Sequence, residues 1–215
     1  MELAIFDLDG TLIDSKLDLA HAVNAARADL GLAALPNELI SSYVGDGAPV
    51  LMRRALGPDA PETEVARALE FFLVYYREHM LDNTTLYPGV HNALDRMRHS
   101  GLKLAILTNK PVRISQAIME GLSLGDYFAH IYGGNSFPFK KPNPIGIETL
   151  LAQLNATREK TVMVGDSGID METAHNARVQ ACGVTYGFAP ETLNAHRPDF
   201  LVDNLEQLAD RIIEP

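Results

Sequence analysis

Short apolar runs that end abruptly on polar residues recur along this 215-residue chain. Three of them are followed by Asp7, by Thr108 and, after one glycine, by Asp166. The runs cover residues 2–6, 102–107 and 161–164. Runs this brief are typical of buried strands. Because ligands bind at the carboxyl ends of the strands in an open parallel sheet, we expect the three polar side chains to meet in one crevice.

Segments with apolar residues at helical spacing separate these runs, so strand and helix alternate from residue 87 onward. This alternation predicts an α/β fold with a Rossmann-like parallel sheet and helices on both faces. Further strands are expected at 131–133, 182–185 and 200–202. Helices are expected at about 88–99, 112–122, up to 154, 168–178 and 204–213.

A second kind of pattern fills the segment between the first strand and residue 84. Helical spacing is visible at 15–30, 47–56 and 62–81, and no convincing strand is. The sequence therefore predicts a helical domain at 14–83, inserted into a discontinuous α/β core formed by 1–13 and 84–215. The two connections would act as a hinge for a lid that closes over the substrate.

Composition limits the possible partners. The net charge is −10 with no basic run, which argues against a nucleic-acid surface. The apolar runs are too short to cross a membrane, and the early acidic residues do not fit a signal peptide. The single Cys182 cannot form an internal disulfide, and we expect it to be a buried, inert thiol in a cytoplasmic protein. A monomer or homodimer is expected.

Asp7 and Asp9 point to the same side if the strand continues through them, so their charges would crowd unless the backbone turns or a cation intervenes. Alone, this pair could equally be a surface turn or a cap. It does not begin a calcium loop, because Leu12 stands at the required glycine and Asp18 at the closing glutamate. A dinucleotide fingerprint fails at 45–50, and no phosphate-binding loop or serine-hydrolase elbow is present.

Four sequence features in order resemble the haloacid dehalogenase superfamily. They are Asp7-Leu8-Asp9-Gly10-Thr11, Thr108, Lys141-Pro142 and Gly165-Asp166 with Asp170. The match covers the whole chain, including a helical cap inserted after the first motif. Within the superfamily, the residues at 6–12, 44–48, 87–90 and 108–111 look most like those of phosphoglycolate phosphatases.

This resemblance implies that Asp7 is a nucleophile that forms an aspartyl phosphate, and that Asp9 is the general acid and then the general base. It also implies Mg²⁺, held by Asp7, the backbone carbonyl of Asp9 and Asp166. Asp170 would lie just outside these ligands, where it would hold a water or orient Lys141.

The remaining site residues are assigned on the same resemblance. Lys141, rather than its neighbour Lys140, would neutralise the phosphoryl group and Asp7. Other phosphate or substrate contacts are expected from Thr108, the backbone amide of Asn109, Gly10, and the cap glycines Gly45 and Gly47. Two alternatives stay open here: Thr108 could cap the following helix, and Asp166 with Ser167 could cap the helix at 168–178. Arg53 and Arg54 could reach an anionic substrate or form a solvated face.

The expected activity is Mg²⁺-dependent hydrolysis of a small phosphate monoester, with phosphoglycolate as the leading substrate. A phosphomutase or pyrophosphatase of the same fold remains an alternative, as does a haloacid dehalogenase, although Asp9 argues against the last. A non-catalytic binding or regulatory module is the alternative from a different class. One departure is Arg178, where relatives commonly have glycine; a left-handed arginine there would reduce stability by about 1 kcal/mol.

Overall fold

The computed structural model describes residues 1–213 and divides into two compact units. One unit joins Met1–Asp14 to Leu86–Pro215, and the other is Ser15–Thr85. The predicted core was 1–13 with 84–215. The chain passes between the units at two places, which contain the short strands β2 (Ile13–Asp14) and β3 (Thr85–Leu86). These strands form a separate two-stranded sheet.

The first unit is built on a six-stranded sheet with the order β5-β4-β1-β6-β7-β8. All neighbouring strands in it run parallel, so the predicted α/β parallel sheet is confirmed. The strands are β1 (Leu3–Phe6), β4 (Lys103–Leu107), β5 (His130–Tyr132), β6 (Thr161–Gly165), β7 (Gln180–Val184) and β8 (Phe200–Val202).

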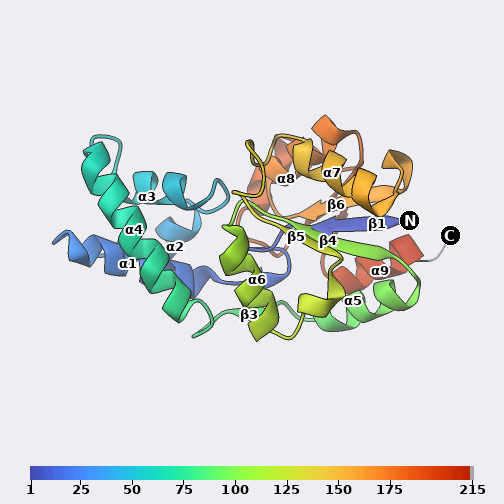
Figure 1. Ribbon diagram of the computed structural model, residues 1–215, viewed down its shortest axis with the longest axis horizontal. Coiled ribbons are helices and arrows are strands. Elements are labelled where there is room, and N and C mark those ends of the chain that lie inside the picture. Colours follow the sequence, from blue (N-terminus) through green and yellow to red (C-terminus); the bar gives the residue numbers. More distant parts are fainter. Residues whose placement is uncertain (214–215) are drawn as a thin grey trace. The chain divides into compact units, whose positions relative to one another are not determined.

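Helices cover both faces of this sheet (Figure 1). On one face lie α7 (Ile145–Leu154) and α8 (Gly168–Ala177). On the other lie α5 (Val90–His99), α6 (Val112–Gly121) and α9 (Leu205–Ile213). Three short 3-10 helices complete the unit: η1 (Gly125–Tyr127), η2 (Arg158–Lys160) and η3 (Pro190–Asn194).

The central strand β1 is fully buried because its side chains alternate between two covered faces. Leu3 and Ile5 join the apolar core that includes residues of α7 and α8, whereas the Phe6 ring contacts Phe128 edge to face at 6.4 Å. Burial of each such side chain contributes about 1.5–3 kcal/mol. Pairing on both edges of β1 with β4 and β6 fixes where the strand ends.

The second unit consists of four helices: α1 (Lys16–Asp29), α2 (Asn37–Ser41), α3 (Ala48–Leu56) and α4 (Glu62–His79). Apolar residues of α4 face its interior, where the rings of Phe72 and Tyr76 are buried and stack at 5.5 Å. No helix in residues 1–213 is both long enough and apolar enough to span a membrane.

The buried carboxylate of Asp18 links the two ends of this unit. The Asp18 side chain accepts hydrogen bonds from the backbone and side chain of both Asn83 and Thr84, at 2.8–3.0 Å. Burial alone would raise the pKa of Asp18, but these hydrogen bonds outweigh it and lower the pKa. The start and the end of the inserted segment are thereby joined.

Some local features differ from the predictions. The sequence showed no strand near the cap boundaries, yet β2 and β3 lie there; two residues are too few for a periodic pattern. The five-residue helix α2 was missed for the same reason. Cys182 is buried as predicted, and burial raises the pKa of its thiol to about 12. Arg178 does adopt the left-handed conformation, with φ 57° and ψ 43° at the end of α8.

Candidate active site

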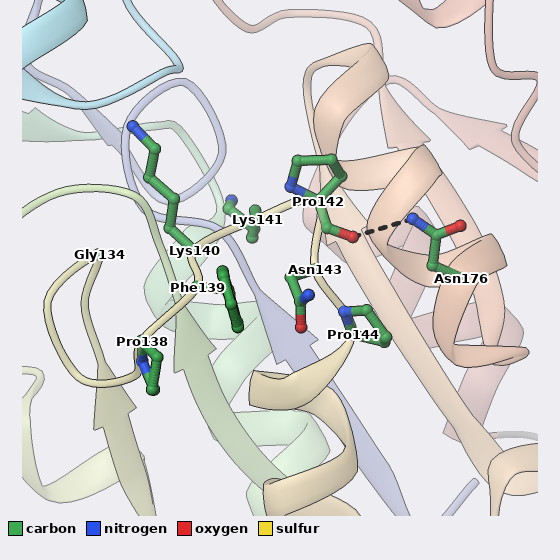
Figure 2. A pocket seen from close by; sticks show the side chains of 9 residues that line it. All are labelled: Gly134, Pro138, Phe139, Lys140, Lys141, Pro142, Asn143, Pro144 and Asn176. Atoms are coloured by element: carbon green, nitrogen blue, oxygen red, sulfur yellow. Dashed lines mark hydrogen bonds between the residues drawn. The ribbon is translucent and has the colours of Figure 1, made fainter.

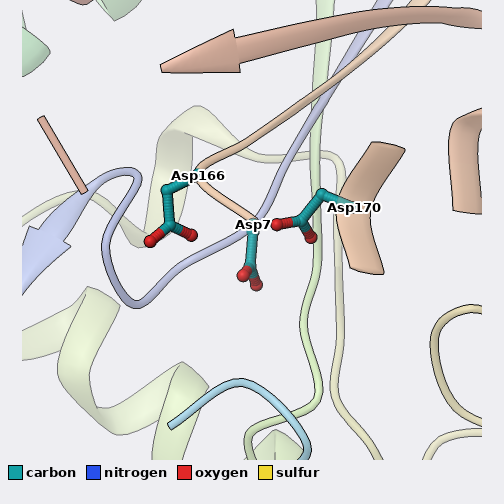
Figure 3. A group of neighbouring side chains, drawn as sticks. All are labelled: Asp7, Asp166 and Asp170. Carbon is teal, nitrogen blue, oxygen red and sulfur yellow. The ribbon is translucent and has the colours of Figure 1, made fainter. Parts of the chain in front are cut away.

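Three carboxylates meet at the carboxyl edge of the sheet (Figure 3). Asp7 follows β1, Asp166 follows β6, and Asp170 lies in the first turn of α8. One oxygen from each side chain lies within 4.8 Å of the others, and all three residues are buried. The Asp7 amide donates to the Val164 carbonyl at 2.9 Å, so the sheet fixes the backbone from which the Asp7 carboxylate extends.

This clustering shifts the proton equilibria of the two strand-end carboxylates. Burial raises the pKa of Asp7 to about 6, an effect that Lys141 opposes and Asp170 reinforces. Burial, with the charges of Asp170 and Asp7, raises the pKa of Asp166 to about 8. Burial is the largest cause of both pKa shifts, the neighbouring carboxylates add to it, and Lys141 offsets only part of it. Buried oxygen donors in this arrangement fit a hard divalent cation.

Lys141 carries the positive charge that the cluster does contain. Its ammonium Nζ lies 2.9 Å from Oδ1 of Asp7 and 2.6 Å from Oδ1 of Asp170, and the residue is 4% exposed. Burial alone would lower the pKa of Lys141, but Asp170 and Asp7 together raise it. Lys141 is therefore a permanent cation beside the predicted nucleophile.

The chain around Lys141 fixes its backbone from two sides. The Asn109 side chain donates to the Lys141 carbonyl at 3.2 Å, and Asn176 donates to the Pro142 carbonyl at 2.9 Å. The Lys141-Pro142 peptide is cis. Figure 2 shows Lys140 leaving the loop in a different direction from Lys141, along an open pocket of about 660 Å³. The structure thus places Lys141, and not Lys140, among the carboxylates.

Asp170 has both of its oxygens occupied. Oδ1 accepts from Lys141, while Oδ2 accepts from the backbone amide and hydroxyl of Ser167 at 3.2 and 2.7 Å. Ser167 and Asp170 form a capping box at the start of α8, so the capping alternative is correct for Ser167. These contacts support the prediction that Asp170 orients Lys141.

Asp166 is held by a return loop that follows β7. Its Oδ2 accepts from the backbone amides of Phe188 at 2.6 Å and Ala189 at 3.4 Å. Two glycines make room for this carboxylate: a Cβ on Gly10 would lie 2.2 Å from its Oδ2, and a Cβ on Gly187 would lie 2.1 Å from its Cβ. The role predicted for Gly10 was different, a close turn around the phosphate, and that role stays a prediction.

Asp9 is not part of the cluster of Asp7, Asp166 and Asp170, and it forms an ion pair with a different lysine, Lys110. The Nζ atom of Lys110 lies 2.8 Å from Oδ1 and 3.0 Å from Oδ2 of Asp9. Lys110 is 6% exposed, and it follows β4 by three residues. No role was predicted for it. It lies within the segment 108–111, and the resemblance of that segment to phosphoglycolate phosphatases was a sequence signal that could have drawn attention to it.

The other residues predicted at the end of β4 are buried. Thr108 donates its amide to the Tyr132 carbonyl at 3.0 Å, and its hydroxyl accepts from the Lys110 amide at 3.3 Å. The alternative that Thr108 caps the next helix is wrong, since α6 is preceded by Pro111 as its N-cap. The predicted phosphate contacts of Thr108 and of the Asn109 amide stay predictions.

The cap residues predicted to contact substrate lie in the second unit. Gly45 and Gly47 have positive φ angles of 126° and 85°, and Gly47 is the N-cap of α3. Arg54 pairs with Asp46 at 2.6 Å, whereas Arg53 bonds Glu62 and the Ala60 carbonyl. Both arginines are therefore engaged inside the cap. The contact of Gly45 and Gly47 with substrate stays a prediction.

Known proteins resemble this chain over almost its full length. Residues 4–184 match the model of the haloacid dehalogenase-like hydrolases. A phosphoglycolate phosphatase from Chromobacterium violaceum is 42% identical over 212 residues, covering 95% of this chain and 93% of the relative. The phosphoglycolate phosphatase of Colwellia psychrerythraea is 38% identical over 214 residues, covering 96% and 95%.

A solved structure shares the same fold. It is that of a predicted phosphoglycolate phosphatase from Haemophilus somnus, which superposes with a TM-score of 0.93 at 31% identity and covers 98% of this chain and 97% of the other. The predicted resemblance and the predicted enzyme class, a hydrolase like these relatives, are confirmed. The chain belongs to the haloacid dehalogenase-like hydrolase family.

Proposed function

We propose that this enzyme is a Mg²⁺-dependent phosphatase that hydrolyses a small phosphate monoester, with phosphoglycolate as its principal substrate. The observation that carries the proposal is the Lys141 ammonium, which lies 2.9 Å from Asp7 within a buried carboxylate cluster. A phosphate dianion repels nucleophiles, so a phosphatase must above all position its groups and neutralise charge. The names of the closely similar relatives support phosphoglycolate.

Asp7 acts as the nucleophile in the first half of the reaction. One of its carboxylate oxygens attacks phosphorus, and the bond from phosphorus to the ester oxygen breaks. Asp9 gives its proton to the departing oxygen, which leaves as an alcohol. Lys141 neutralises negative charge on the nucleophile and on the transferring phosphoryl group.

Water completes the cycle in the second half. Asp9, now ionised, takes a proton from a water molecule that attacks phosphorus, and the bond to Asp7 breaks to release inorganic phosphate. Asp7 and Asp166 would hold the metal with the backbone carbonyl of Asp9. When bound, Mg²⁺ supplies positive charge that offsets the clustered carboxylates and the phosphate. Asp170 keeps Lys141 in place throughout.

The experiment that tests this proposal is a phosphate-release assay with phosphoglycolate, sugar phosphates and pyrophosphate, with and without Mg²⁺. Wild-type enzyme should release phosphate from phosphoglycolate in preference to the others and only with the metal. Asp7→Asn should reduce the rate by about 10³-fold or more, as is typical when a nucleophile is removed.

A label-transfer experiment tests the covalent step directly. After acid quenching, wild-type enzyme mixed with radiolabelled substrate should retain label, and Asp7→Asn should not. Phosphate release that survives in Asp7→Asn would contradict the mechanism. Turnover that requires a sugar bisphosphate would instead favour a phosphomutase, and preference for pyrophosphate a pyrophosphatase. The expected small-molecule partner, a monomeric or dimeric state and a cytoplasmic location stay predictions.

A further inference from the structure

Within residues 1–213, two lysines are buried, and they face different carboxylates. Lys141 lies between Asp7 and Asp170, on the side of the nucleophile. Lys110 contacts both oxygens of Asp9, at 2.8 and 3.0 Å. A buried ammonium ion is unfavourable unless an anion lies beside it, so each lysine marks a place where negative charge is accommodated.

The position of Asp9 fixes which part of the substrate Lys110 can approach. A general acid must lie within about 2.6–3.2 Å of the oxygen that it protonates. Lys110 is in direct contact with Asp9, so its ammonium would lie beside the leaving oxygen, whereas Lys141 lies beside the nucleophile Asp7. In a phosphorylated 2-hydroxy acid, the carboxylate is attached one methylene beyond that oxygen.

We propose that Lys110 is the residue that reads the carboxylate of the substrate, so that the site selects phosphorylated hydroxy acids over phosphorylated alcohols. This inference rests on the proposed function. In the structure the Lys110 ammonium bonds the Asp9 carboxylate, and in the substrate complex it binds the substrate carboxylate as a second anionic partner. An ammonium has three donor hydrogens, which is enough to contact both.

The backbone holds Lys110 in place for this role. Its carbonyl accepts from the Gly134 amide at 2.9 Å, and a Cβ on Gly133 would lie 2.5 Å from that same oxygen. The two glycines after β5 thus let the chain approach Lys110 closely. The Lys110 side chain therefore extends from a well-supported backbone at the carboxyl edge of the sheet. A residue that distinguishes substrates needs such support to hold its charge in position.

The test compares two substrates that differ in the carboxylate. Phosphoglycolate carries it, and ethyl phosphate has a methyl group instead. We measure kcat/KM for both with wild-type enzyme and with Lys110→Met, which keeps most of the side-chain length and removes the charge. Loss of the Asp9 contact should slow both substrates. The ratio of phosphoglycolate to ethyl phosphate should also fall, by about 10- to 100-fold, as expected for a lost hydrogen bond to a charged group.

The ratio distinguishes recognition from a structural role. Both substrates are measured on one preparation, so a smaller folded fraction cancels. Lys110→Arg should keep most of the ratio, because it keeps the charge. Lys110→Gln serves as a second neutral variant if Lys110→Met does not fold. Lys160→Met is the matched control. Lys160 is exposed and precedes β6, whereas Asp166 of the site follows the other end of that strand. Removal of the Lys160 charge should leave the ratio unchanged.

Each outcome decides the question. If neutral variants slow both substrates equally, Lys110 only positions Asp9 and the inference is overturned. If wild-type enzyme prefers phosphoglycolate but the neutral variants keep that preference, the inference fails while the proposed function stands. If wild-type enzyme hydrolyses neither substrate, or both equally well, the proposed substrate is wrong and the inference fails with it.

Discussion

The Nζ atom of Lys141 lies 2.9 Å from Oδ1 of Asp7, in a site from which solvent is largely excluded. Asp170 binds the same ammonium at 2.6 Å and is itself held by Ser167 in the capping box of α8. A helix start, a lysine and the predicted nucleophile thus form one continuous set of contacts. The position of the nucleophile depends on residues far apart in the sequence.

Removal of this charge should affect chemistry far more than folding of the sheet. We expect Lys141→Met to lower kcat by about 10²- to 10³-fold, the usual effect of deleting a group that stabilises transition-state charge. Lys140→Met is the matched control, because the neighbouring lysine is exposed, and it should stay within about twofold of wild type. Full activity in both variants would defeat the assignment.

The carboxylate cluster predicts how metal and pH act on stability. The pKa values of Asp7, about 6, and Asp166, about 8, are raised above the ordinary value near 4, so the folded metal-free protein binds protons that the unfolded chain releases. Stability without metal should therefore fall as pH rises through about 6 and about 8. Asp18, whose pKa is lowered, is ionised throughout this range and adds no such slope.

Mg²⁺ should remove this loss, because it binds the ionised carboxylates of the folded state. Thermal unfolding with Mg²⁺ and with EDTA, from pH 5.5 to 8.5, measures the effect. The difference in Tm should grow with pH, reaching about 5 °C or more at the upper end. Asp166→Asn should show a smaller increase. A Tm difference that shrinks as pH rises would contradict the role of these carboxylates.

Gly10 provides a steric test of the metal site. Its φ is +81°, and an added Cβ would lie 2.2 Å from Oδ2 of Asp166. Gly10→Ala should displace that carboxylate and raise the Mg²⁺ concentration needed for half-maximal activity by about tenfold or more. Gly101→Ala is the matched control, because φ is +84° there but nothing lies within 4 Å of the new atom.

The two alanine variants share a backbone penalty of about 1 kcal/mol, since both residues are left-handed. In denaturant titrations Gly10→Ala should lose more stability than Gly101→Ala, because its Cβ also overlaps Asp166. Only Gly10→Ala should change the Mg²⁺ requirement. An equal Mg²⁺ requirement in both would show that the space beside Asp166 is not needed for the metal.

Arg178 offers a stabilising substitution. It is a non-glycine residue with φ 57° at the end of α8, a conformation that is unfavourable for a side chain with a Cβ. We expect Arg178→Gly to increase the free energy of unfolding by up to about 1 kcal/mol, which is a rise in Tm of about 2–4 °C. Arg178→Ala keeps the Cβ and should give no gain. Calorimetry of the three proteins checks this.

The sequence predicted the sheet and the strand-end carboxylates because both are encoded locally. A buried run such as Leu3–Phe6 is visible in the composition of four residues, and Asp7 follows it directly. The spacing from Asp166 to Asp170 placed them one helical turn apart. These are relations within a few residues of one another.

What could not be predicted depends on contacts between distant segments. Nothing in the residues near Asp9 indicates that Lys110 will bond both of its oxygens. The amides of Phe188 and Ala189 reach Asp166 because a loop returns after β7, and no local pattern specifies that return. The close approach of Asp166 to Gly10 has the same origin.

The four hydrogen bonds that join Asp18 to Asn83 and Thr84 hold the two ends of the inserted segment together. An insertion whose two ends are held together imposes little loop-closure entropy on the chain that hosts it. The segment Ser15–Thr85 is therefore exchangeable in principle, while the strands that carry Asp7 and Asp166 stay as they are. A change confined to this one continuous segment can therefore leave the carboxylates at the sheet edge in place.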